Sequence, residues 1–86
     1  MEMPQVAAPQ NPAGMVDLLL QMTAPDQQEA KLLQALQRVQ AGVKSLEEQR
    51  LGYEENGWHT AWQIQFDNKT ALVAAITRVL AERFGR

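Results

Sequence analysis

The stretch that decides the fold is residues 58–84, WHTAWQIQFDNKTALVAAITRVLAERF. Steps of four and three residues through it reach large apolar side chains with one polar interruption: Trp62, Phe66, Lys69, Val73, Ile76 and Leu80. A second row, at a spacing of seven, widens this stripe: Trp58, Gln65, Leu72 and Val79. The pattern predicts one long amphipathic helix whose apolar surface is covered by the residues upstream.

Residues 51–66 also permit a different interpretation. Asn56-Gly57 is a strong signal for a tight turn between β-strands. Three apolar side chains then alternate with glutamines, as in a half-buried strand: Trp62, Ile64 and Phe66. In that case Asp67 or Asn68 would cap a shorter C-terminal helix. We favour the helix and keep the strand as the alternative.

A second seam of apolar residues runs through the middle of the chain. Its spacing of four, three, four and three is typical of a coiled coil: Leu32, Leu36, Val39, Val43 and Leu46, with Leu33 thickening the seam. Thr23 to Asp26 has the form of a capping box, and Asp26 to Glu29 repeats that signal three residues later. The seam predicts a helix that ends near Leu51.

The connection between these two helices is short. Gly52 can supply a left-handed C-cap, and Asn56-Gly57 is a turn signal. A connection of this length makes the two helices antiparallel neighbours.

The N-terminal region differs in composition. Residues 1–14 hold three prolines, a glycine and a single charge, which predicts an extended arm before a helical domain at 15–86. Asn11 and Pro12 can nevertheless begin a short helix, with Asn11 as its cap. The apolar residues that follow point in nearly every direction, so this helix needs covering on more than one side. The predicted fold is all-α: an antiparallel helical hairpin with a short N-terminal helix and an extended N-terminal arm.

Charge and composition exclude several classes of function. The net charge is −2 and the pI is about 5.2, which argues against a nucleic-acid partner, because such binding depends on clustered Lys and Arg. With no cysteine, the chain has no thiolate nucleophile and no Cys-based metal site. The sequence lacks an apolar run of the roughly 20 residues that span a membrane, and its N-terminus lacks the signal-peptide pattern. We expect a soluble protein, cytoplasmic when synthesised, whose export would need no cleaved signal.

Residues able to carry chemistry are few and scattered. His59 is the one histidine and Ser45 the one serine. The pairs Glu47-Glu48 and Glu54-Glu55 are adjacent in sequence, so their side chains do not face each other on a helix. Because no phosphate-binding or calcium-loop motif accompanies them, we predict no catalytic residue, no metal, no cofactor and no enzymatic activity.

The aromatic residues of the C-terminal stretch have two interpretations, as core of their own domain or as a surface for another chain. A hairpin partner covers about one stripe, while this helix presents two, and Trp is enriched at interface hot spots. We therefore predict a protein interface that draws on both ends of the sequence. Its residues are Met15, Leu18, Leu19, Trp58, Trp62, Phe66, Val73, Ile76 and Leu80.

Residues 62–84 resemble the C-terminal helix of the needle subunits of type III secretion systems. The shared pattern comprises aromatic residues at Trp62 and Phe66, Asp67-Asn68, and aliphatic residues that continue to Val79-Leu80. The connection between the helices departs from the family, which usually brackets it with prolines, and Thr77-Arg78 stands where the family tends to carry Lys-Asp.

The resemblance implies a non-enzymatic structural subunit that self-assembles helically around a channel, with copies of itself or a chaperone as partners. The C-terminal helix would line the lumen, and the arm would pack between neighbours. The chain is also similar to the small cochaperones of such needles, through Trp62-Gln63 and Ala71-Leu72. The alternative is therefore a helical chaperone or regulatory adaptor that binds one protein partner through the face of Trp58, Trp62 and Phe66.

Overall fold

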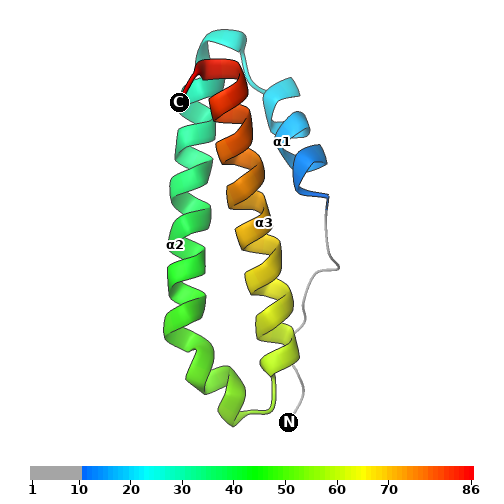
Figure 1. The fold of residues 1–86 in the computed structure, drawn as a ribbon, viewed down its shortest axis with the longest axis vertical. Helices are drawn as coiled ribbons and strands as arrows, with labels where there is room; N and C mark the ends of the chain where they lie inside the picture. Colours follow the sequence, from blue (N-terminus) through cyan, green and yellow to red (C-terminus); the bar gives the residue numbers. More distant parts are fainter. Residues whose placement is uncertain (1–10) are drawn as a thin grey trace.

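The computed structural model describes residues 11–86, and this part of the chain is all-α (Figure 1). Its elements are α1 (Pro12–Gln21), the short 3₁₀ helix η1 (Pro25–Gln27), α2 (Gln28–Glu55) and α3 (His59–Phe84). Helices α2 and α3 form an antiparallel hairpin, and α1 packs beside them at the end away from the hairpin turn. The predicted fold class is confirmed, and the strand interpretation of 58–66 is wrong because residues 59–66 belong to α3 and Trp58 directly precedes it.

The C-terminal helix follows the predicted stripe. Ala61, Trp62, Ile76 and Leu80 are buried, at the core-facing positions of α3. The helix ends at Gly85, which takes the left-handed conformation with φ 67°. The amide of Gly85 donates to the carbonyl of Ala81 at 3.2 Å, so the glycine satisfies a carbonyl that the helix end would otherwise leave without a partner.

Helix α2 is longer than predicted. Leu32 and Leu46 of its seam are buried, and the other seam residues are half-buried. The prediction that Gly52 forms a left-handed C-cap is wrong, because the helix continues through Gly52 to Glu55. The left-handed residue of the turn is Gly57, with φ 72°. Placing the turn there lets the ring of Trp58 meet Tyr53 edge-on, with centroids 6.2 Å apart.

The predicted capping box at the start of α2 is also wrong. The hydroxyl of Thr23 donates to the carbonyl of Leu19 at 2.6 Å, so Thr23 closes α1 instead of opening α2. The side-chain amide of Gln28 donates to the carbonyl of Leu20 at 3.0 Å. Two side chains therefore bond to carbonyls at the end of α1, in addition to the backbone amide of Thr23, which donates to Leu20. Helix α2 begins after η1 with no side-chain cap.

The start of α1 agrees with the predicted cap. The side-chain oxygen of Asn11 accepts a hydrogen bond from the amide of Gly14 at 3.3 Å, and Pro12 occupies the first helical position. Residues 12–14 are therefore helical, and the predicted boundary of the arm at residue 14 falls three residues too late. Residues 1–10 of the predicted arm lie outside the described residues.

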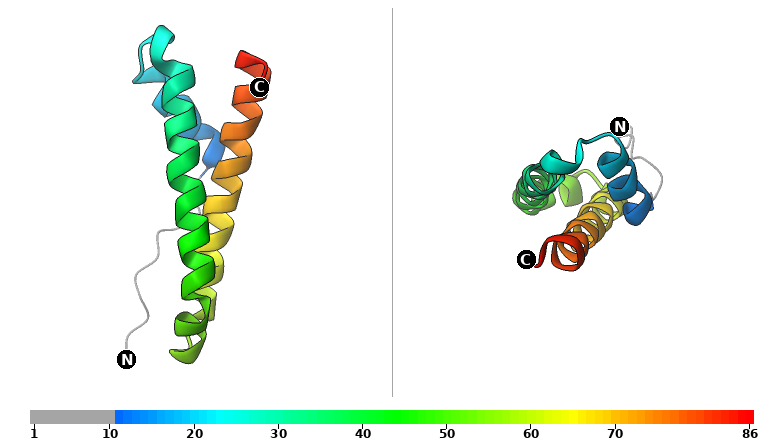
Figure 2. Two further views of the ribbon diagram at one scale, coloured as in Figure 1. Left: turned by 90° about the vertical axis from the view of Figure 1, so that its left-hand side faces the viewer. Right: turned by 90° about the horizontal axis from the view of Figure 1, so that it is seen from above.

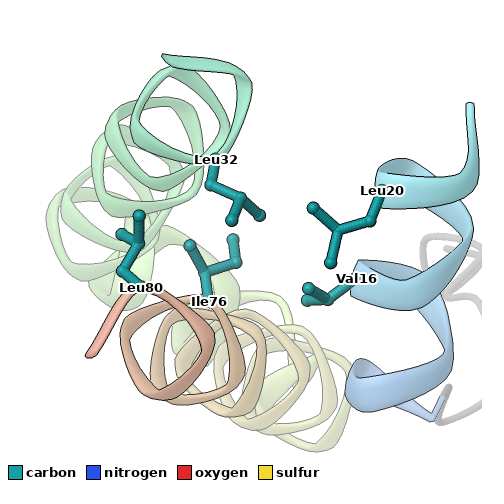
Figure 3. Packing of buried hydrophobic residues seen from close by; sticks show 5 residues of the cluster. All are labelled: Val16, Leu20, Leu32, Ile76 and Leu80. Carbon is teal, nitrogen blue, oxygen red and sulfur yellow. The ribbon is translucent and has the colours of Figure 1, made fainter. Parts of the chain in front are cut away.

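The hydrophobic core draws on all three α-helices. Seen along the long axis of the molecule, α1 lies beside α3, and α2 lies farther from it (Figure 2). Figure 3 shows the side chains that meet there: Val16 and Leu20 from α1, Leu32 from α2, and Ile76 and Leu80 from α3. Leu32 is fully buried at the centre of this cluster. Helix α1 is thus held by Val16 and Leu20, with the half-buried Leu19 packed against the same cluster.

Candidate protein-binding groove

An apolar groove of about 450 Å³ lies where α1 meets the hairpin. We call it the α1 groove. Its lining combines Met15, Val16, Leu18, Leu19 and Met22 of α1 with Ala35 and Val39 of α2 and Leu72 and Ile76 of α3. A volume of this size is within the range of about 300–1,000 Å³ that is typical of ligand-binding pockets. The groove is therefore large enough to receive several apolar side chains.

The wall of the groove that α1 supplies is open to solvent. Met15 is 41% exposed, Leu18 is 56% exposed and Met22 is 77% exposed, while Leu19 is half-buried. The cause is the sequence of α1, which is apolar all round although one face meets the core. The predicted interface residues Met15, Leu18 and Leu19 thus come together in one place, and the structure adds Met22 to them.

Three other predicted interface residues lie inside the chain's own core. Trp62 is 6% exposed, Ile76 2% and Leu80 3%. The indole N–H of Trp62 donates to the carbonyl of Leu46 at 2.6 Å, across the hairpin. Their burial is a correction to the predicted interface, because α1 and α2 cover the stripe more fully than a single helix would. Of the three, only Ile76 reaches the groove, as part of its floor.

The remaining predicted residues, Trp58, Phe66 and Val73, are half-buried and do not line the α1 groove. The ring of Phe66 stacks on Trp62, with centroids 4.8 Å apart and planes 13° apart. The guanidinium of Arg50 lies over the Trp62 ring at 5.0 Å from its centroid. The aromatic row is therefore engaged mainly in contacts within the hairpin.

The candidate chemical residues lie on the surface, where His59 lines a small depression together with Arg50 and Glu54. His59 and Ser45 are exposed, and the hydroxyl of Ser45 accepts from the side-chain amide of Gln49 at 3.2 Å. Within residues 11–86, no group of three or more His, Asp or Glu side chains is placed to hold a metal ion. No helix in the same range is long and apolar enough to cross a membrane.

Ion pairs lie on the surface of the described chain. Arg50 pairs with Glu54 at 3.0 Å, Arg78 with Glu82 at 2.9 Å, and Arg86 with Glu29. The hydrogen bond and the charge of Glu82 raise the pKa of Arg78 above its ordinary value. Such exposed pairs contribute little to stability, because solvent screens them.

Comparison of the chain with family models, with curated proteins and with solved structures finds no match. The resemblance to needle subunits therefore stays a prediction.

Besides the buried Val16, four groove residues were missed by the sequence analysis: Met22, Ala35, Val39 and Leu72. The sequence did hold a signal for Met22, because a short helix with apolar side chains on several sides must leave some of them uncovered when it packs on a hairpin. Ala35, Val39 and Leu72 line the groove only because α1 packs beside them, and no local sequence pattern encodes the position of α1 on the hairpin.

Proposed function

We propose that this chain is a non-enzymatic helical module that binds another protein through the α1 groove. The observation that supports it most is the continuous apolar lining, one wall of which carries the exposed side chains of Met15, Leu18 and Met22. Exposed apolar residues that gather into one patch mark interaction sites more often than scattered ones do.

The chemistry of the lining favours a protein segment over a small molecule. Sites for small ligands combine apolar walls with a few polar groups that fix the ligand's orientation. The residues that line the α1 groove are all apolar. A lining of this kind suits the apolar face of a helix, which supplies its own orientation through the spacing of its side chains. Methionines on such a surface adapt to the shape of the partner.

This proposal keeps the adaptor function that was the alternative in the sequence analysis but changes its surface. The expected surface was the face of Trp58, Trp62 and Phe66. Trp62 is buried, Trp58 packs against Tyr53, and Phe66 stacks on Trp62. Met15, Leu18 and Met22 at the groove are exposed, whereas Trp58 and Phe66 are half-buried.

A second candidate is the self-assembling subunit of secretion-needle type. It is favoured by one further observation: Leu51, near the turn of the hairpin, is 65% exposed. Leu51 lies 12 residues beyond Val39, which is about 18 Å along a helix. Two separate apolar positions are what head-to-tail assembly needs, because an open filament joins unlike surfaces.

The binding function is tested with helical probes. We would titrate a panel of cross-linked amphipathic peptides, each with leucines at positions i, i+4 and i+7, and follow fluorescence anisotropy. We expect saturable binding that Leu18→Glu abolishes and that Leu51→Glu leaves unchanged, because both leucines are exposed but only Leu18 lines the groove. Absence of binding by every peptide, or equal loss in both variants, would overturn the proposal.

Self-assembly needs its own measurement. Sedimentation velocity over a wide concentration range, with negative-stain microscopy of each sample, separates an open-ended series of oligomers from a discrete species. Needle-type assembly predicts filaments that disappear with either Leu18→Glu or Leu51→Glu. A discrete monomer or dimer at all concentrations would exclude it.

A further inference from the structure

We infer that the partner of the α1 groove is an amphipathic helix with acidic residues along the flank that meets α2. The inference rests on the proposed function and names the chemistry of the partner. It starts from the basic residues of α2 that border the groove.

Two exposed basic residues of α2, Lys31 and Arg38, lie in the sequence on either side of the groove residue Ala35. Lys31 is four residues before Ala35, and Arg38 is three residues after it. Residues at these spacings lie on one face of a helix. Since Ala35 lines the groove, Lys31 and Arg38 lie along its edge, about 10 Å apart along the axis of α2.

These two cations have no acidic partner within the described part of the chain. The ion pairs formed by residues 11–86 engage Arg50, Arg78 and Arg86 instead. The one charged residue of α1, Asp17, lines a different depression together with Arg83. The groove therefore combines an apolar floor with an unneutralised basic edge, and an acidic flank on the partner complements it.

The dimensions of the groove set the length of the partner segment. Its α1 wall runs from Met15 to Met22, eight residues that rise about 10 Å along the helix axis. Two to three turns of a partner helix match this length, with apolar anchors at i, i+3 or i+4, and i+7. The acidic residues then fall on the side of that helix adjacent to Lys31 and Arg38.

A second copy of the chain fits this groove less well. If α1 of another copy inserted its exposed Met15, Leu18 and Met22, its Asp17 would not lie beside them, because Asp17 belongs to the side of α1 near Arg83. A separate helix with an acidic flank can place apolar side chains in the groove and carboxylates beside Lys31 and Arg38.

The test compares three cross-linked helical peptides with the same leucines and a flank of Glu, Gln or Lys. At low ionic strength we expect the Glu peptide to bind most tightly and the Lys peptide least, with steps of roughly two- to fivefold for each charge contact. Combined Lys31→Glu and Arg38→Glu should invert this order. Lys44→Glu, a single charge reversal at another exposed position of α2, should keep it. Circular dichroism confirms that each variant is folded.

The outcomes separate the two proposals. If the three peptides bind equally well and the double reversal changes nothing, the acidic partner is excluded while the groove remains a binding site. If no peptide binds, the proposed function fails. If sedimentation velocity shows a dimer that Leu18→Glu dissociates, the occupant is a second copy and the inference is overturned.

Discussion

The indole N–H of Trp62 donates a hydrogen bond to the main-chain carbonyl of Leu46, with 2.6 Å between nitrogen and oxygen. The two residues belong to α3 and α2 and are both buried. An indole N–H in an apolar interior needs an acceptor. The bond therefore favours one alignment of the two helices over alignments in which one helix is shifted along the other. Apolar side chains alone specify such an alignment less strictly.

Trp62→Phe tests this bond. We expect the variant to fold and to lose about 1 kcal/mol of unfolding free energy, because the ring still stacks but the hydrogen bond is gone. Trp62→Ala should lose about 3–5 kcal/mol, because it also leaves a cavity. Chemical denaturation followed by far-ultraviolet circular dichroism measures both. Trp58→Phe is the control at a half-buried position, and a loss there as large as at Trp62 would contradict the role of the bond.

Gly42→Ala should stabilise the protein. Gly42 lies inside α2, where glycine costs about 1 kcal/mol relative to alanine. A Cβ at this position would lie 3.4 Å from Cδ and Cε of Lys69, a contact that the flexible lysine accommodates. We expect a gain of about 0.5–1 kcal/mol in the same denaturation assay.

Gly52→Ala is the matched control for that gain, because it is a second glycine of α2 with open space around the new Cβ. If Gly52→Ala stabilises while Gly42→Ala destabilises, the Lys69 side chain cannot move aside. The packing between Gly42 and Lys69 is then tighter than the 3.4 Å distance indicates.

Gly57→Ala should act in the opposite direction. Gly57 has φ 72°, a conformation that alanine adopts at a cost of about 1 kcal/mol, and its surroundings are otherwise open. We expect a loss of that size, with most of it recovered in Gly57→Asn, since asparagine tolerates the left-handed region. Equal losses in the two variants would show that the backbone conformation is not the cause.

Much of the fold follows from periodicity alone. The spacing of apolar residues from Leu32 to Leu46 and from Trp62 to Leu80 predicts two long helices, and both form. The ends of helices were harder to predict, because capping depends on which side chain reaches which backbone group. Thr23 satisfies a carbonyl of α1, although its spacing to Asp26 matches a cap for the next helix.

The candidate site was predictable only in part. Met15 and Leu18 were expected at an interface because α1 is apolar on all sides, and both are exposed at the groove. Trp62 was assigned to the same interface because it is a large aromatic residue, yet its hydrogen bond to Leu46 places it in the core. Sequence spacing identifies the apolar stripe of a helix but not how much of it the neighbouring helices cover.

Asn11→Ala tests whether α1 is the least stable wall of the groove. The Asn11 cap holds the first turn of α1, and the helix reaches the core through Val16 and Leu20. Loss of such a cap typically costs about 0.5–2 kcal/mol, and an element held by few buried residues opens before the rest of the structure. We expect faster amide hydrogen exchange in α1 with unchanged exchange at the centres of α2 and α3.

Asn11→Asp, which retains a capping oxygen, should exchange at the same rates as the unmodified protein. Equal acceleration in all three helices would mean that α1 unfolds only together with the hairpin, and the groove would then be a rigid feature of the fold.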